Sequence, residues 1–115
     1  MHELSIAMSI VELAEEEMAE RTGARLDGIH LKLGALAGVV KGALLSAWEL
    51  ACEGTSFAGC RLVIEEVPIL VFCPACRASR KLVSIQHFEC PECRSPVSEV
   101  LEGRELKVVA LEIQE

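Results

Sequence analysis

The sequence predicts an α+β protein in which two helices pack on one face of a three-stranded sheet and a four-cysteine module is inserted into the chain. Two observations carry this prediction. Segments with a helical repeat of apolar residues alternate with strand-like segments, and two Cys-Pro-X-Cys pairs stand close together in the C-terminal half. The 115 residues suit one modest core, which must be mainly aliphatic because the chain has one Trp, three Phe and no Tyr.

The first expected element is an amphipathic helix. Apolar residues recur at helical spacing near the N-terminus, and acidic residues occupy the positions between them. The apolar set is Leu4, Ala7, Met8, Val11, Ala14 and Met18, and the acidic set is Glu12, Glu15, Glu16, Glu17 and Glu20. Thr22 and Gly23 are expected to end this helix. We interpret the acidic set as a solvated face, because carboxylates spread around a helix seldom converge on one metal ion.

A strand and a second helix follow. Between residues 28 and 34, apolar and polar residues alternate as in a strand with one buried face. From Lys41 to Glu53 the repeat is helical again, and Gly54 is placed to cap the helix C-terminus. Trp48 is expected to anchor the core from this second helix.

Two further strand-like segments enclose the cysteine pairs. One runs from Arg61 to Phe72, with Pro68 interrupting any continuous ladder, and the other runs from Arg104 to Ile113. These two segments are expected to pair, so that the cysteine module projects from the sheet between them. The predicted boundaries are residues 1–70 with 100–115 for the α+β domain and residues 71–99 for the metal module.

Charge and hydropathy limit the partners and the compartment. The net charge of -7 gives no general electrostatic attraction to nucleic acid or to an anionic membrane. No apolar run approaches the roughly 20 residues that span a bilayer, and Glu3 stands where a signal peptide would be basic. We therefore expect a cytoplasmic protein with reduced thiols, in which Cys52 and Cys60 are small buried hydrophobes.

The paired cysteines predict a structural zinc site. Cys73 and Cys76 are separated from Cys90 and Cys93 by thirteen residues. Two residues between cysteines let both thiolates of a turn face one metal, and two such turns complete the tetrahedron that zinc prefers at about 2.3 Å per sulfur. Four protein ligands leave no open position for a substrate, so a structural role is favoured over catalysis. Iron in the same cage is the alternative metal.

The residues between the two pairs leave other interpretations open. His87 could replace a cysteine ligand, although a surface histidine is the simpler interpretation. Arg77, Arg80 and Lys81 form a local basic patch, which is the one feature that favours a nucleic-acid-binding zinc ribbon. His30, in the predicted strand, is a second auxiliary donor that is more simply structural.

The first three residues form a candidate nickel chelate. The α-amine of Met1, the backbone nitrogen of His2 and the His2 imidazole can bind one metal in fused rings, and the amide or carboxylate of Glu3 can supply a fourth donor. Nitrogen-rich square-planar sites suit Ni(II) or Cu(II). The reference pKa values of imidazole and α-amine, about 6.5 and 7.7 to 8.0, let a metal displace their protons near neutral pH.

Several stretches together make the sequence similar to a known family, over essentially the whole chain. They are the opening Met-His-Glu-Leu-Ser before an acidic helix, Leu31-Lys-Leu-Gly-Ala-Leu-Ala-Gly38, Glu53-Gly-Thr55, Leu62 to Pro68, the two Cys-Pro-X-Cys pairs and the ending Gly103-Arg-Glu-Leu106. With these motifs the chain resembles the HypA/HybF family of hydrogenase nickel-incorporation proteins. The N-terminal triplet and the Gly-Arg-Glu-Leu ending are the specific part, because many zinc proteins share the cysteine motif.

The resemblance implies a nickel metallochaperone that helps to insert Ni(II) into the [NiFe]-hydrogenase large subunit during maturation and is not an enzyme. It implies a nickel site at Met1, His2 and Glu3 in the α+β domain, and a structural zinc site at the four cysteines. The implied partners are the HypB GTPase and the large-subunit precursor, and a homodimer is left open. The segment 38–42 has no acidic residue, so no further carboxylate ligand is expected there.

The alternative function is a zinc-ribbon adaptor that binds protein or RNA through the metal module, with the N-terminal triplet incidental. An enzyme is set below both, because the sequence has no nucleophile paired with a base, no phosphate-binding glycine loop and no open metal site.

Overall fold

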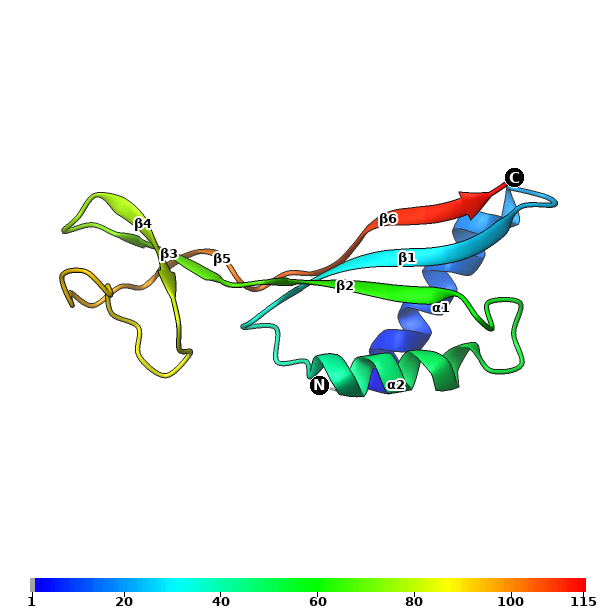
Figure 1. The fold of residues 1–115 in the computed structure, drawn as a ribbon, viewed down its shortest axis with the longest axis horizontal. Helices are drawn as coiled ribbons and strands as arrows, with labels where there is room; N and C mark the ends of the chain where they lie inside the picture. The colour runs from blue at the N-terminus through cyan, green and yellow to red at the C-terminus, as the bar shows by residue number, and fades with distance from the viewer. Residues whose placement is uncertain (1) are drawn as a thin grey trace. The chain divides into compact units, whose positions relative to one another are not determined.

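The computed structural model describes residues 2–115 and contains two helices and two three-stranded sheets (Figure 1). The predicted α+β class is confirmed. In chain order the elements are α1 (Glu3–Ala19), β1 (Arg25–Gly34), α2 (Lys41–Cys52), β2 (Arg61–Val67), β3 (Ile69–Cys73), β4 (Ala78–Leu82), β5 (Glu99–Glu102) and β6 (Leu106–Gln114).

The chain divides into two compact units. The first comprises the residues up to 31, with 39–65 and 107–115, and the second comprises 32–38 with 66–106. Each unit is therefore built from segments that are distant in the sequence. The helices belong to the first unit and all four paired cysteines to the second.

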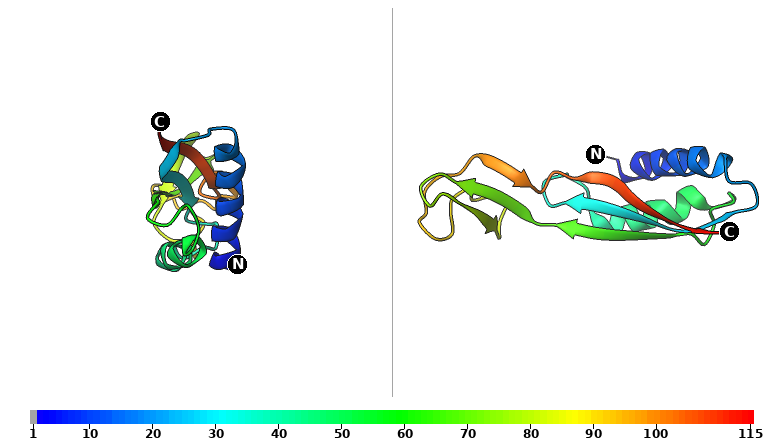
Figure 2. Two further views of the ribbon diagram at one scale, coloured as in Figure 1. Left: turned by 90° about the vertical axis from the view of Figure 1, so that its right-hand side faces the viewer. Right: turned by 90° about the horizontal axis from the view of Figure 1, so that it is seen from above.

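The sheet of the first unit has the strand order β2-β1-β6. The arrowheads of β1 and β2 point the same way, with α2 as the crossover between them, and β6 runs in the opposite direction (Figure 2). The expected pairing of the segments 61–72 and 104–113 is wrong for β2 and β6, since β1 lies between them. The strands on either side of the cysteines that do pair are β3 and β5. A parallel β1-α2-β2 crossover places β2 at one edge of β1 and leaves the other edge to β6.

Both helices lie on one side of this sheet, as expected (Figure 2). The buried positions of α1 are Ala7, Ile10, Val11 and Ala14. Leu4 and Met8 were expected on the buried stripe, but their side chains are 42% and 54% exposed. Ile10 takes the place of Met8, and two alanines on the buried face let α1 pack closely. The acidic residues expected to form a solvated face are exposed, namely Glu12, Glu15, Glu16, Glu17 and Glu20.

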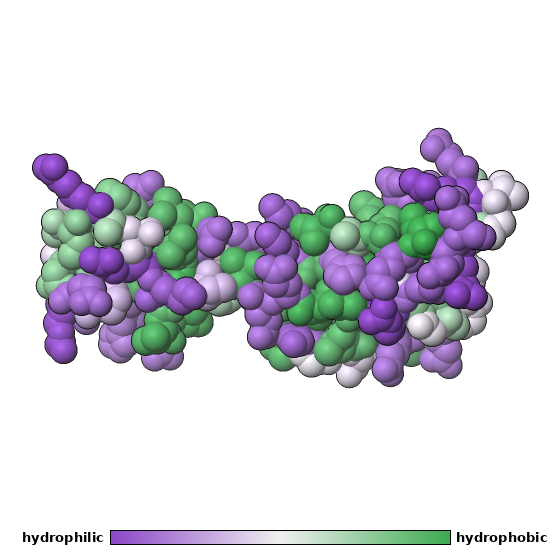
Figure 3. Space-filling view, turned by 45° about the horizontal axis from the view of Figure 1, so that its top comes forward, coloured by the Kyte–Doolittle hydropathy of each residue, from purple (hydrophilic) through white to green (hydrophobic). Residues whose placement is uncertain are grey.

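Trp48 anchors the core of the first unit. It is 3% exposed, and its indole Nε1 donates a hydrogen bond to the backbone oxygen of Cys60 over 2.8 Å. Cys52 and Cys60 are also buried, which confirms their expected role as apolar residues. No helix of residues 2–115 covers the other face of the sheet (Figure 2), and this face carries a mixture of polar and apolar side chains (Figure 3).

The sheet of the second unit, with the order β4-β3-β5, was not expected from the sequence. Pro68 separates β2 from β3, so the predicted continuous strand from 61 to 72 is two strands in two different sheets. In the β3-β4 ladder, Ile69 lies opposite Leu82 and Cys73 opposite Ala78. The hydrophobic cluster around the cysteines contains six buried residues, which are Ile69, Val71, Cys73, Leu82, Cys90 and Val97.

Two glycines let three segments of the second unit cross closely. The Gly34 amide donates to Glu105 O over 2.7 Å, and the Leu36 amide donates to Gly103 O over 2.6 Å. A Cβ atom on Gly34 would lie 2.1 Å from the Gly103 backbone oxygen, and Gly103 itself has φ +126°. Two of the stretches that carry the family resemblance, those containing Gly34 and Gly103, therefore meet here for a steric reason.

Within residues 2–115, neither helix is long and apolar enough to cross a membrane.

Candidate metal centre

Two similar turns present the four cysteines. Cys73 ends β3, and the Cys76 amide donates to its sulfur over 3.4 Å. In the second turn the Arg94 amide donates to Cys90 O, and the Cys90 amide donates to Ser95 O, both over 2.8 Å. The residue after each pair, Arg77 or Arg94, has a positive φ of 54° or 64°. This left-handed residue reverses the chain so that both sulfurs of a pair point to one centre.

The four sulfur atoms are spaced for one tetrahedral metal. Cys73 Sγ and Cys93 Sγ are 3.6 Å apart, Cys76 Sγ and Cys90 Sγ are 3.9 Å apart, and all four lie within 4.8 Å of one another. A tetrahedron with metal-sulfur bonds of about 2.3 Å has sulfur-sulfur edges of about 3.8 Å. A disulfide needs about 2.05 Å, so neither close pair is bonded. The group is the one cluster of three or more metal-binding side chains found among residues 2–115.

The two cysteine pairs differ in exposure and in acidity. Cys73 and Cys90 are fully buried, Cys76 is intermediate and Cys93 is exposed. The backbone amides of Cys93 and Glu92 donate to the Cys90 sulfur and lower its pKa to about 6, against the effect of burial. Hydrogen bonds from the Ser95 hydroxyl and amide lower the pKa of Cys93. In the first pair, by contrast, hydrogen bonding with Cys93 raises the pKa of Cys76 to about 11. The second turn therefore stabilises thiolates, which are the metal-binding form of cysteine.

Arg80 approaches the same sulfurs from β4. Hydrogen bonding of its guanidinium to Cys76 and then to Cys90 raises the pKa of Arg80. Its Nε atom is buried and has no hydrogen-bond partner. Arg77 and Lys81 are exposed and Arg80 is half-buried, so the predicted basic patch divides into two solvated cations and one half-buried cation.

These residues fit a zinc ion. Four sulfurs at tetrahedral spacing, amide donors to the thiolates and a nearby cation are surroundings that suit zinc held by four cysteines. Cys73, Cys76, Cys90 and Cys93 would hold the ion, which would supply folding free energy to a unit with a small core. His87 is exposed and lies outside the four-cysteine group.

The candidate nickel residues stand at the start of α1. Met1 lies outside the described residues. His2 is exposed, precedes the first helical residue, and makes no side-chain hydrogen bond to the helix end. The Glu3 carboxylate accepts a hydrogen bond from the Val40 amide over 3.2 Å, and this bond lowers the Glu3 pKa. Glu3 thus joins the beginning of α1 to the residue that precedes α2.

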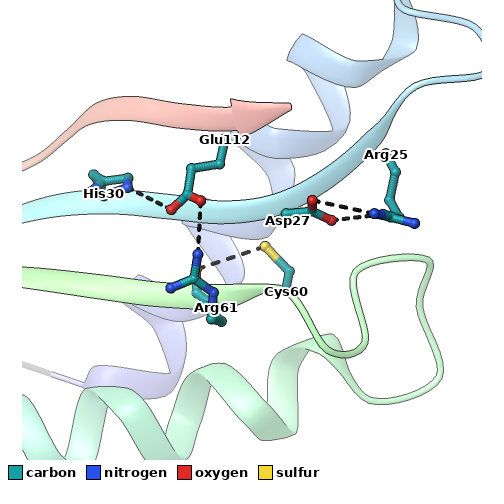
Figure 4. Close-up of polar contacts among 6 residues, drawn as sticks. All are labelled: Arg25, Asp27, His30, Cys60, Arg61 and Glu112. Atoms are coloured by element: carbon teal, nitrogen blue, oxygen red, sulfur yellow. Dashed lines mark hydrogen bonds and ion pairs between the residues drawn. The ribbon is translucent and has the colours of Figure 1, made fainter. Parts of the chain in front are cut away.

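His30 belongs to a polar cluster on the open face of the first sheet (Figure 4). Its Nε2 lies 2.8 Å from one carboxylate oxygen of Glu112, and the Arg61 guanidinium donates to the other over 2.8 Å. The three residues come from β1, β6 and β2, so the cluster links all three strands. All three side chains are more than a third exposed, which limits their contribution to stability to a small one.

A family model described as hydrogenase/urease nickel incorporation, metallochaperone, hypA, matches residues 1–113. The hydrogenase maturation factor HypA of Chloroflexus aurantiacus is 50% identical over 112 residues, which is 97% of this chain and 98% of the relative. HypA of a Roseiflexus species is 44% identical over 115 residues, covering 100% and 94%. The hydrogenase maturation factor HybF of Klebsiella pneumoniae is 37% identical over 113 residues, covering 97% and 98%.

Two solved structures share the fold. The solution structure of a HypA protein has a TM-score of 0.68 at 23% identity and covers 99% of this chain and 97% of that one. The solution structure of the Ni metallochaperone HypA from Helicobacter pylori has a TM-score of 0.62 at 24% identity and covers 97% of each chain. With the whole-length family match and relatives at up to 50% identity, these findings place the chain in the HypA family of hydrogenase/urease nickel-incorporation proteins.

Proposed function

We propose that this chain is a nickel metallochaperone that binds Ni(II) through Met1, His2 and Glu3 and helps to insert it into the large subunit of [NiFe]-hydrogenase. In this proposal Cys73, Cys76, Cys90 and Cys93 hold a structural zinc ion. The observation that carries it is the closed tetrahedral arrangement of the four sulfurs, which suits a resident metal and leaves the cargo to another site. The HypB GTPase and the large-subunit precursor are the proposed partners, in the cytoplasm.

The position of His2 supports the nickel site. Its side chain is exposed and makes no capping hydrogen bond to the helix, so metal binding to the imidazole breaks no such contact. The backbone nitrogen of His2 precedes α1 and donates no helical hydrogen bond, because the first amides of a helix have no intrahelical acceptor. Amine, amide and imidazole can therefore bind Ni(II) without unwinding α1.

Delivery requires a site that can also release its metal. A short chelate at an exposed chain end can be opened by competing ligands, and protonation of its imidazole and α-amine releases the metal in acid. A closed thiolate cage would hold the cargo too strongly for transfer. The proposal therefore assigns the two metals to two chemically different sites in the two units.

Nickel titration of zinc-loaded protein tests this assignment. His2→Ala should weaken Ni(II) binding by more than about 100-fold, because loss of an outer-shell partner alone costs 10- to 100-fold and a direct ligand contributes more. Adding one residue before Met1 should have the same effect, since it moves the α-amine. His87→Ala is the matched control, because it removes an exposed imidazole outside both sites. Unchanged Ni(II) binding in the His2→Ala protein would refute the nickel site.

The alternative function, a zinc-ribbon adaptor for RNA or protein, would leave nickel binding unrelated to His2. Salt-dependent RNA binding that Lys81→Gln weakens would favour that alternative.

A further inference from the structure

The four paired cysteines differ in how far solvent reaches them. Cys73 and Cys90 are 0% exposed and belong to the buried cluster of the second unit. Cys76 is intermediate, and Cys93 is the one exposed member of the group. The susceptibility of a thiolate to oxidation follows its exposure, because a dissolved oxidant must reach the sulfur. An oxidant in solution therefore meets Cys93 first.

A second cysteine already lies beside the exposed one. The Sγ atom of Cys93 is 3.6 Å from that of Cys73, and the Sγ atoms of Cys76 and Cys90 are 3.9 Å apart. Both close pairs join one turn to the other. A disulfide needs about 2.05 Å between sulfurs, so Cys73 and Cys93 have only about 1.5 Å to close.

The backbone of the second turn holds Cys93 in this position. The Cys90 amide donates to Ser95 O and the Arg94 amide donates to Cys90 O, both over 2.8 Å, so the turn is closed on both sides of Cys93. These hydrogen bonds involve no sulfur atom. The turn can therefore keep Cys93 next to Cys73 while the sulfur itself changes its oxidation state.

We propose that the four-cysteine group is a redox-sensitive site, in which a hydroperoxide oxidises Cys93 first and Cys73 then forms a disulfide with it across the two turns. This inference rests on the proposed zinc site. The disulfide removes two of the four sulfur ligands. The two sulfurs that remain, those of Cys76 and Cys90, do not complete a tetrahedral site, so oxidation releases the metal.

The reaction uses one hydroperoxide for each disulfide. The Cys93 thiolate attacks one oxygen of the peroxide, the O–O bond breaks, and the departing oxygen takes a proton and leaves as water or an alcohol. The Cys73 thiolate then attacks the sulfur of the Cys93 sulfenic acid, the S–O bond breaks, and the oxygen leaves as water with a second proton. Two thiolates thus lose two electrons to the peroxide, and a dithiol can reverse the change by thiol-disulfide exchange.

Peroxide treatment of the zinc-loaded full chain tests the pairing. One equivalent of hydrogen peroxide should release one zinc ion for each disulfide formed, measured with a chromogenic chelator. Mass spectrometry with fragmentation of the linked peptides should find Cys73 joined to Cys93. Dithiothreitol should restore a reduced chain that binds zinc again. A main product that joins Cys93 to Cys76 or to Cys90 would overturn the inference.

Two histidine variants separate the exposed ligand from the half-buried one. Zinc accepts three cysteines and one histidine, so Cys93→His and Cys76→His can each retain the metal. Peroxide-driven zinc release should slow at least about tenfold in Cys93→His, because the remaining thiolates are less exposed. It should stay within roughly threefold of wild type in Cys76→His, which keeps both cysteines of the proposed disulfide.

The variants also give the contrary result a clear form. Equal release rates in wild type and Cys93→His would show that Cys93 is not the point of attack. Cys60→Ala removes a buried cysteine of the first unit and should match wild type. If Cys93→His does not retain zinc, the identity of the wild-type disulfide decides by the criterion already given.

Metal content separates this inference from the proposed zinc site. If the wild-type chain binds no zinc, the proposed zinc site fails, and the disulfide that peroxide forms in the metal-free chain still tests the pairing: a bond from Cys73 to Cys93 supports it, and any other main product overturns it. If the wild type binds full zinc and keeps it after one equivalent of peroxide, only the redox inference fails.

Discussion

The four-cysteine cluster and the proposed nickel site at the N-terminus differ in how their described residues are arranged without a metal. The cysteine sulfurs are already gathered within 4.8 Å of one another, and two of them are fully buried. His2 is exposed, and the Glu3 carboxylate accepts a hydrogen bond from the Val40 amide. A preorganised site loses little entropy when it binds and holds its metal for long periods, whereas an unorganised one releases metal readily.

The two units also differ in what stabilises them. The first unit has a core built around Trp48 from both helices and the sheet, and the two free cysteines in it are simply buried apolar residues. In the second unit, two of the six buried residues in the cluster around the cysteines are the predicted metal ligands Cys73 and Cys90. We therefore expect the second unit to depend on its metal and the first to depend on apolar burial.

Loss of one ligand sulfur should have the largest effect, and this effect should be confined to the second unit. In Cys90→Ala the zinc content should fall from full to negligible, and residues 66–106 should lose amide protection, because structural zinc supplies roughly 10 to 16 kcal/mol of apparent binding energy. Zinc analysis and hydrogen exchange measure both effects. The amides of α1 and α2 should remain protected.

Cys60→Ala is the control for that experiment. It removes a cysteine that is also buried, at 7% exposure, but lies in the first unit. Zinc content should remain full in this variant. Full zinc content in Cys90→Ala would show that the cage does not require all four sulfurs.

Cysteine spacing predicted the ligand cluster because two residues between cysteines impose a local turn that few other contacts can change. The pairing of the strands in the second sheet could not be predicted from the sequence in this way. The second sheet depends on β4, whose sequence Ala-Ser-Arg-Lys-Leu is mostly polar, and on β5, which is only Glu99–Glu102. Neither has the apolar alternation by which an isolated strand is recognised.

Arg80 shows a second limit of the sequence. Among three nearby cations it was grouped as part of one basic patch, whereas the structure places it alone on the buried face. Arg80 lies an even number of residues after Cys76 and Ala78, and on a strand such residues share one face. That spacing becomes informative only when the segment is known to be a strand.

The close crossing at Gly34 gives the next largest expected effect, in a place where no metal ligand is involved. Gly34→Ala should destabilise the second unit by about 3 kcal/mol or more, because overpacking against backbone atoms cannot be relieved by a side-chain rotation. Its Cβ would meet the Gly103 oxygen at 2.1 Å and the Glu105 nitrogen at 2.6 Å. Denaturant unfolding of zinc-loaded protein measures the loss.

Gly42→Ala makes the same chemical change in open space, since a Cβ there has nothing within 4 Å. It lies in α2, where Ala is favoured over Gly by about 1 kcal/mol, so this control should be neutral or slightly stabilising. Equal stability of the two variants would show that the crossing at Gly34 can relax.

The smallest expected effect concerns Glu3. Its carboxylate either binds the metal or stabilises the start of α1 through the hydrogen bond from the Val40 amide. The hydrogen bond from the Val40 amide lowers the Glu3 pKa, so the contact is favoured in the ionised form. Its contribution should be present above the unfolded pKa of about 4.3 and should be lost as the pH falls through the lower folded value. An NMR titration of the Glu3 side chain would show this direction.

Two substitutions separate the roles of the Glu3 carboxylate. Glu3→Gln keeps an oxygen that can accept from the Val40 amide but is a poorer metal ligand, and Glu3→Ala removes both functions. If the carboxylate supports the start of α1 while nitrogen donors bind the metal, Ni(II) affinity should change by less than roughly threefold in Gln and by up to about tenfold in Ala. Equal large losses in both would instead make the carboxylate a nickel ligand, and the N-terminal site would then have to exchange its contact with Val40 for the metal each time it binds its cargo.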